Sequence, residues 1–209
     1  MDEAAPAPRP HPSELHELIA VLLLSLVAVL TAWCGFQASQ WGGNSSVAFN
    51  EASDARIDAA SFESEARDAR ALDLAVYAQW VIAEAQGDED LADYIEDRFS
   101  PEFAKAFTAW EADGRVEKGP FALKVYVPPG TEKSVAALAD ADAKFQQGID
   151  FNDKSDRYSL MTVLFALVLF LSAIAQRGIS LLASRIVLGL AGALSLIGVI
   201  ALLTFPVTF

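Results

Sequence analysis

Two long apolar runs near the carboxyl end constrain this chain more than any other feature. Residues 158–176 and 186–205 contain no charged side chain, and Arg177 and Arg185 lie in the turn between them, 177–185. A helix of this length spans about 28 Å, close to the roughly 30 Å hydrocarbon core of a bilayer. A buried hairpin in a soluble protein is the alternative, but two such uncharged runs are rare in soluble folds. The pattern therefore predicts two membrane-spanning helices.

A third uncharged stretch begins at Leu18. We assign residues 13–36 to a first transmembrane helix with Ser13 as its N-cap, after a segment rich in Pro and Ala, 1–12, that is predicted to be disordered. A cleaved signal peptide is the alternative. The apolar run is longer than a typical signal core, and Arg9 is the one basic residue before it. An uncleaved membrane anchor therefore fits better.

The segment between the first and second spans, 37–157, is strongly acidic. It holds most of the 28 acidic residues of a chain whose formal net charge is −13. Such a segment repels phosphate backbones and anionic lipid headgroups, so no nucleic-acid partner is expected. The single cysteine, Cys34, excludes an intrachain disulfide.

Basic residues beside the spans predict the orientation. Arg177 and Arg185 lie in a short turn without an acid, which favours the cytoplasm for that turn. The N-terminus is then cytoplasmic, and residues 37–157 lie outside the cytoplasm. Lys154 and Arg157, on the other side of the second span, argue for the opposite orientation.

A long helix is predicted from residue 46 to about residue 86, after a break or kink at 42–46 that contains two glycines, with Asn44 or Ser46 as its N-cap. Its apolar and small residues recur in alternating steps of four and three, with Leu72 substituting for the missed position at Asp73. The positions are Ala48, Ala52, Ala55, Ala59, Phe62, Ala66, Ala69, Val76 and Trp80. A seam of alanines permits close approach but buries little area, so this helix needs a partner.

Two short helices, 88–99 and 100–113, are predicted next. Gly87 serves as a C-cap, and Asp88 and Ser100 serve as N-caps. Together with the extended segment that follows them, both are expected to form a cap far from the membrane.

Alternating side chains over residues 121–127 then predict a short extended segment. The last long helix is predicted to run from 131 to about 176, capped by Thr131, without a break before the second span. Its inner face is expected to hold Val135, Leu138, Ala141, Phe145 and Ile149. The predicted fold is an all-α membrane protein with three transmembrane helices, a long antiparallel helical hairpin and a small helical cap outside the membrane.

Aromatic residues near the ends of the spans and small residues within the last span carry two further predictions. Trp33, Phe36, Trp41 and Tyr158 are expected at one membrane interface, although some of them could pack against neighbouring helices instead. In the last span two pairs of small residues four apart favour close helix packing, against the chain's own spans or a second copy. These pairs are Gly189 with Ala193 and Ala191 with Ser195.

Three short signatures can be compared with known families: the Asn-Glu-Ala step at residues 50–52, the Arg-Tyr entry at 157–158 and the Gly/Ala-rich last span at 189–198. With this layout the chain resembles an uncharacterised family of small bacterial membrane proteins built around a domain of unknown function. The resemblance implies three spans with a helical domain between the first and second. It supplies no functional residue.

No motif predicts catalysis. Histidine occurs only at His11 and His16, and no glycine-rich phosphate loop or nucleophile motif is present. Two acid clusters could bind a divalent cation, but their spacing matches no EF-hand, and a solvated acidic surface is the better account. The clusters are Asp88, Glu89, Asp90 and Asp93, and Asp150, Asp153 and Asp156. We therefore predict no enzyme and assign no catalytic, cofactor or metal residue.

Three functions agree with this pattern. The first is a non-enzymatic protein of the bacterial inner membrane, a scaffold or assembly component that binds a protein partner or a second copy through its acidic helical domain. The second is a small oligomeric channel or a transporter accessory subunit. The third is a membrane-bound sensor without its own output domain. The expected partners are the lipid bilayer and a protein partner or a second copy. No small-molecule substrate is inferred.

Overall fold

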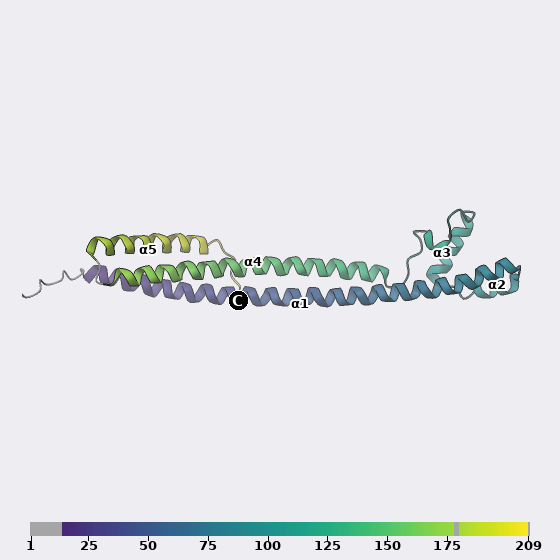
Figure 1. The fold of residues 1–209 in the computed structure, drawn as a ribbon, viewed down its shortest axis with the longest axis horizontal. Coiled ribbons are helices and arrows are strands. Elements are labelled where there is room, and N and C mark those ends of the chain that lie inside the picture. The colour runs from purple at the N-terminus through teal and green to yellow at the C-terminus, as the bar shows by residue number, and fades with distance from the viewer. Residues whose placement is uncertain (1–13, 178–179, 209) are drawn as a thin grey trace, which may run out of the picture. The chain divides into compact units, whose positions relative to one another are not determined.

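The computed structural model describes residues 14–177 and 180–208 (Figure 1). Within these residues it contains five α-helices, one short 3-10 helix and no strand, so the predicted all-helical class is confirmed. The elements are α1 (Glu14–Gln86), α2 (Glu89–Glu96), α3 (Pro101–Ala112), η1 (Pro120–Ala122), α4 (Thr131–Ala175) and α5 (Leu181–Leu202). The predicted disordered tail, 1–12, and the predicted N-cap Ser13 lie outside the described residues.

Three of these helices, α1, α4 and α5, are long and apolar enough to cross a membrane. α1 contains the predicted span 13–36 from residue 14 on, and α4 contains 158–175 of the predicted span 158–176. α5 begins five residues before the predicted span 186–205 and ends at Leu202, three residues before its predicted end. α4 runs without interruption from Thr131 to Ala175, as predicted, so its polar first part and its apolar second part form one helix.

The chain divides into two compact units. Unit 1 comprises Met1–Val47 and Gln147–Phe209, and unit 2 comprises Ala48–Gln146. α1 and α4 contribute residues to both units.

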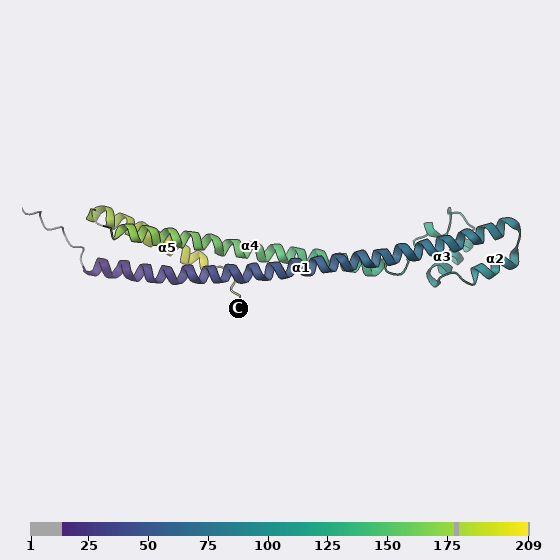
Figure 2. The ribbon, with the colours of Figure 1, turned by 60° about the horizontal axis from the view of Figure 1, so that its bottom comes forward.

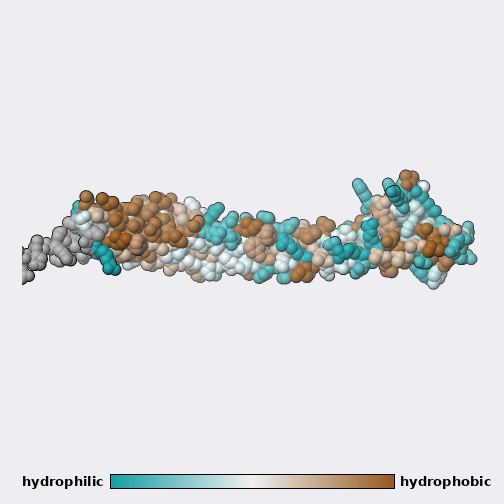
Figure 3. Space-filling model, in the orientation of Figure 1, coloured by the Kyte–Doolittle hydropathy of each residue, from teal (hydrophilic) through white to brown (hydrophobic). Residues whose placement is uncertain are grey.

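Unit 1 packs three helices around a small core and leaves many large apolar side chains on its outside. The core residues are Val27, Cys34, Trp41, Tyr158, Phe165, Val168 and Ala191. Figure 3 shows hydrophobic residues gathered over α5 and the parts of α1 and α4 beside it. Among them, Phe170 is 61% exposed. An apolar outside of this kind suits lipid rather than water.

Small residues bring α5 close to α4, which it follows in both views (Figures 1 and 2). A Cβ added at Gly198 would lie 2.8 Å from the ring of Phe165, so only glycine fits this contact. The two predicted pairs of small residues differ in burial. Ala191 and Ser195 are buried, whereas Gly189 and Ala193 are exposed. The buried pair therefore packs within the chain itself.

The segment after α5 is held by side chains of α1 and α4. The amide of Gln37 bonds the backbone of Thr208 twice, at 2.9 Å and 3.1 Å. The Trp41 indole and the Tyr158 hydroxyl both donate to the carbonyl of Pro206, at 3.3 Å and 3.0 Å. Two of the four predicted interfacial aromatics are therefore buried and pack against neighbouring segments.

The predicted break at residues 42–46 is wrong, because α1 continues through it. The Ser46 hydroxyl donates to the carbonyl of Gly42 within the helix, at 3.1 Å. The Ser45 hydroxyl donates across to the carbonyl of Gly148 in α4, at 2.8 Å. Both hydroxyls thus bond carbonyls of packed helices instead of capping a new helix.

In unit 2, α1 and α4 run antiparallel along the predicted alanine seam. The Lys144 ammonium lies 2.8 Å from the Glu51 carboxylate, and the Arg56 guanidinium lies 3.9 Å from the Asp142 carboxylate. The four alanines at the start of the seam are buried: Ala48, Ala52, Ala55 and Ala59. Burial of these first four positions agrees with the spacing of the predicted seam.

The inner face of α4 differs from the prediction. Ala141 is fully buried, but Val135 and Leu138 are exposed, and Ser134 is buried in their place. Thr131 is the first helical residue and does not cap the helix from outside. The carbonyl of Gly130 accepts the first helical hydrogen bond, from the Ser134 amide at 2.8 Å.

The caps of the short helices are confirmed. Gly87 has a φ of +71°, the Asp88 side chain accepts from the amide of Leu91, and the Ser100 side chain accepts from the amide of Phe103. These local signals identify both helix starts because the caps satisfy amides that no helix carbonyl can reach.

The predicted extended segment at 121–127 is wrong. The stretch contains η1 and turns, and the described residues contain no strand to pair with it. Its alternating apolar side chains, Phe121, Leu123 and Val125, pack against the aromatic core of unit 2. A short segment without a strand partner takes the conformation that its side-chain contacts favour.

Candidate functional site

The core of unit 2 is an aromatic cluster built by the end of α1, by α2 and α3, and by the segment after α3. Its buried members are Trp80, Ala83, Ala92, Phe99, Phe103, Ala106, Phe107, Trp110 and Tyr126. The ring of Phe103 lies 4.8 Å from that of Phe99 and 4.7 Å from that of Phe121. Sequence analysis missed this cluster, although Phe99, Phe103 and Phe107 recur in steps of four.

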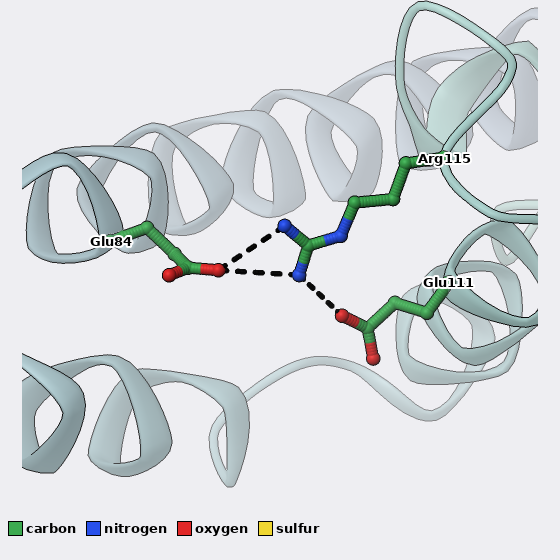
Figure 4. A network of polar contacts seen from close by, with 3 residues as sticks. All are labelled: Glu84, Glu111 and Arg115. Carbon is green, nitrogen blue, oxygen red and sulfur yellow. Dashed lines mark hydrogen bonds and ion pairs between the residues drawn. The ribbon is translucent and has the colours of Figure 1, made fainter.

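Arg115 joins the end of α1 to the end of α3 beside this cluster (Figure 4). Its guanidinium lies 2.6 Å from the Glu111 carboxylate and 3.2 Å from the Glu84 carboxylate. The same group lies 5.3 Å from the ring centroids of Trp80 and Trp110. The hydrogen bond to Glu111 raises the pKa of Arg115. The arginine therefore stays charged and bridges two acids at the surface of the cluster.

A buried carboxylate occupies the position that interrupts the alanine seam. Asp73 is buried, and the Tyr126 hydroxyl donates to it at 2.8 Å. Burial, followed by the bond to Asp73, raises the pKa of Tyr126, so this hydroxyl keeps its proton and remains a donor. Leu72, which was predicted to fill this position, is exposed.

A cleft of about 440 Å³ lies between α1 and the first turn of α4. Its lining includes Arg67 and Arg70 of α1, Tyr126, and Ser134 of α4. The Arg67 guanidinium lies 3.3 Å from the carboxylate of Glu63. Within the described chain, Arg70 has no carboxylate at ion-pair distance. The cleft thus offers one uncompensated cation in an acidic protein.

An apolar face of α1 is left uncovered on the side opposite the aromatic cluster. We call it the exposed stripe; its residues are Ala71, Leu74, Ala75, Ala78, Val81, Ile82 and Ala85, all exposed. Leu74 is 54% exposed and Ile82 is 48% exposed. Trp80 and Ala83, on the opposite side of the same helix, are buried. This part of α1 is therefore apolar on both faces, but only one face has a partner.

Neither acid cluster forms a metal site within residues 14–177 and 180–208. No group of three or more His, Cys, Asp or Glu side chains lies close enough there to hold an ion. Asp88 instead caps α2, and the carboxylate of Asp156 accepts from the Asn152 amide at 3.3 Å. These two acids therefore make local contacts in or beside their own helices.

The chain matches no protein-family model, no curated protein and no solved structure. Its function must therefore be inferred from its own surfaces. Two of them, the exposed stripe and the cleft, present groups that the chain itself leaves without a partner.

Proposed function

We propose that this chain is a non-enzymatic integral membrane protein of the bacterial inner membrane that acts as a scaffold or assembly component. In this proposal, α1, α4 and α5 anchor it, and its acidic helical domain lies outside the cytoplasm. Arg177, just after α4, favours this orientation, as does Arg185, which lies near the start of α5 and not in the predicted turn 177–185. The domain pairs with a second copy through the exposed stripe. The exposure of this stripe is the observation that carries the proposal.

The spacing of the stripe suits pairing with another helix. Ala71, Ala75, Ala78, Ile82 and Ala85 follow one another in alternating steps of four and three, the spacing of a heptad seam. Alanines in such a seam let two helices approach closely, and Ile82 and its neighbours Leu74 and Val81 add apolar area. A contiguous exposed apolar patch in a water-facing domain is typical of an interaction site.

The charge of the domain favours a second copy at this face. Two acidic domains repel each other over most of their surface. Between residues 71 and 86 the only charged residues are Asp73 and Glu84. Asp73 is buried, and Glu84 lies 3.2 Å from the Arg115 guanidinium, which also pairs with Glu111. Two copies can therefore meet along the stripe with little like-charge repulsion.

Anchoring in one membrane adds a geometric argument. Both copies would face the same way, so two stripes would meet in parallel about a two-fold axis, with each residue opposite its own copy. Confinement to the membrane also raises the effective concentration of one copy beside another, so a narrow helical contact suffices.

Cysteine crosslinking in native membranes tests this arrangement. In a Cys34→Ala background, Ala78→Cys is expected to give disulfide-linked dimers on mild oxidation, because position 78 lies opposite itself in a parallel pair. The control is Lys105→Cys, an exposed position of α3 outside the stripe. Equal dimer yields from both variants, or none from Ala78→Cys, would contradict the proposal.

A charge placed in the stripe should separate the copies. Ala78→Glu is expected to abolish the dimer in mild detergent, because it puts two carboxylates opposite each other in an apolar seam. Thr108→Glu adds the same charge at an exposed position of α3 and should leave the dimer intact. Unchanged helix content by circular dichroism would show that Ala78→Glu still folds. A dimer that survives Ala78→Glu would refute pairing through this face.

A sensor without its own output domain is the second candidate, and the cleft between α1 and α4 is the observation that favours it. A channel or transporter subunit would instead show conductance after reconstitution into planar bilayers.

A further inference from the structure

We propose that the cleft between α1 and the first turn of α4 binds a small organic carboxylate with an apolar body. The anionic group would lie between Arg70 and the start of α4, and the apolar body would cover Tyr126 and Val135. This site is independent of the exposed stripe, which lies outside the lining of the cleft.

The first observation is the unpaired cation. Arg70 lines the cleft without a carboxylate partner, whereas its neighbour Arg67 is paired with Glu63 at 3.3 Å. Arg70 does lie over the ring of Phe121, with its guanidinium carbon 5.8 Å from the ring centroid. This contact holds the side chain but leaves its charge uncompensated. A guanidinium binds a carboxylate with two parallel hydrogen bonds, which gives the site its geometric preference.

The second observation is a nearly buried serine on the wall of the cleft. Ser134 lines the same cleft and is only 7% exposed. Its side chain makes no hydrogen bond to any residue that the structure describes, although its amide bonds the carbonyl of Gly130. Its hydroxyl is open to the cleft and can donate a hydrogen bond to an anion bound there.

The start of α4 adds a positive electrostatic potential that favours a bound anion. α4 is a helix of 45 residues that begins at Thr131, and Thr131 and Ser134 both line the cleft. The amides of Thr131 and Ser134 bond the carbonyls of Pro128 and Gly130, so the contribution of this helix start is the positive potential of the helix dipole. An anion beside Ser134 would therefore meet the positive end of this helix as well as Arg70.

A close contact between backbones holds these groups in place. Gly130, just before α4, has a φ of +89°, and a Cβ there would lie 2.4 Å from the carbonyl oxygen of Phe62 in α1. Only glycine allows this approach. It holds the first turn of α4 directly against the part of α1 that carries Arg67 and Arg70, so the cleft is preorganised.

The size and lining of the cleft favour an organic acid over a bare inorganic anion. About 440 Å³ is in the range of small-molecule sites, far more than one phosphate needs. The ring of Tyr126 and the side chain of Val135 supply apolar area. Tyr126 keeps its proton through Asp73, so it adds no negative charge to the site.

Binding of phenylacetate to the full chain in lipid nanodiscs tests the proposal. Saturation-transfer NMR at neutral pH is expected to detect phenylacetate but not 2-phenylethanol, which has the same ring without the carboxylate. Inorganic phosphate should compete at least tenfold more weakly than phenylacetate. Absence of phenylacetate binding, equal binding of the alcohol, or equally strong competition by phosphate would each overturn the proposal.

Variants then assign the binding to these residues. Arg70→Gln is expected to weaken phenylacetate binding at least tenfold, and Ser134→Ala should weaken it severalfold. Arg98→Gln removes an exposed arginine that lies outside the cleft lining and should change nothing. Val135→Trp, at an exposed position of the lining, should block the cleft without disturbing the core. Equal losses in Arg70→Gln and Arg98→Gln would overturn the assignment. Ala78→Glu should leave binding unchanged, so failure of the stripe and failure of the cleft are distinguishable.

Discussion

Unit 1 and unit 2 hold the same two long helices together by different means. Unit 1 relies on small residues and on side chains that bond backbone carbonyls, such as Gly198 against Phe165 and Ser45 on Gly148. Unit 2 passes from an alanine seam to a dense aromatic cluster around Phe103, with ion pairs at its surface. The outside of unit 1 is apolar, whereas charged residues are frequent on unit 2.

The difference agrees with the proposed placement of the spans of unit 1 in lipid and of unit 2 in water. In lipid, burying a large apolar side chain between helices gains little, because the lipid is equally apolar, so close backbone approach and hydrogen bonds hold the helices. In water, burial of aromatic rings is strongly favourable, and charges can remain on the surface. The same α4 therefore packs Phe165 against Gly198 of α5 in unit 1 and buries Ala141 in unit 2.

The largest predicted effect concerns the aromatic cluster. Phe103→Ala removes a fully buried ring, and such changes cost about 3–5 kcal/mol. We expect the amides of α3 to exchange much faster in hydrogen–deuterium exchange on the protein in nanodiscs. The matched variant Phe170→Ala removes an exposed ring of unit 1 and should leave α3 protected. Similar exchange in both variants would show that the cluster does not stabilise unit 2.

A smaller effect is expected for close packing in unit 1. Gly198→Ala would place a methyl group 2.8 Å from the ring of Phe165. Overpacking of this kind costs about 1–3 kcal/mol. Gly189→Ala is the matched variant on the same helix, because a Cβ there meets no atom within 4 Å. Thermal unfolding in nanodiscs should separate the two variants. Equal midpoints would contradict the tight contact between α4 and α5.

The smallest effect concerns surface charge in unit 2. Burial, followed by the charges of Glu111, Asp93 and Asp97, raises the pKa of Glu96. A carboxyl whose folded pKa is raised holds its proton more tightly when folded, so its contribution to stability falls as the pH rises through that pKa. Glu96→Gln should therefore stabilise unit 2 at pH 7, by at most about 0.5 kcal/mol for so exposed a group.

This gain should disappear near pH 4, where Glu96 is largely protonated in the native protein. Urea unfolding at the two pH values measures it. Asp58→Asn removes an exposed acid elsewhere in unit 2 and provides the control for the change in net charge. A gain for Glu96→Gln that is the same at both pH values would contradict the raised pKa.

Signals that lie within a few residues were sufficient to predict much of the fold. The absence of charge over about one membrane thickness predicted the three apolar spans. Gly87, Asp88 and Ser100 predicted the ends and starts of helices, because a cap acts on the backbone beside it. The alternating steps of the alanine seam predicted which side of α1 is buried, since helical periodicity is a property of the chain itself.

Contacts between distant residues decided the rest. The glycines and serines at 42–46 form a break only if nothing else binds them, and packing against α4 keeps them helical. Asp73 is tolerated inside the seam because Tyr126, far along the chain, donates to it. The lining of the cleft likewise comes from separate segments, α1, Tyr126 and α4. The sequence thus determined the helices and their apolar faces, because those follow from local backbone chemistry and periodicity. Only the tertiary structure decided which polar groups found partners and which, like Arg70 and Ser134, did not.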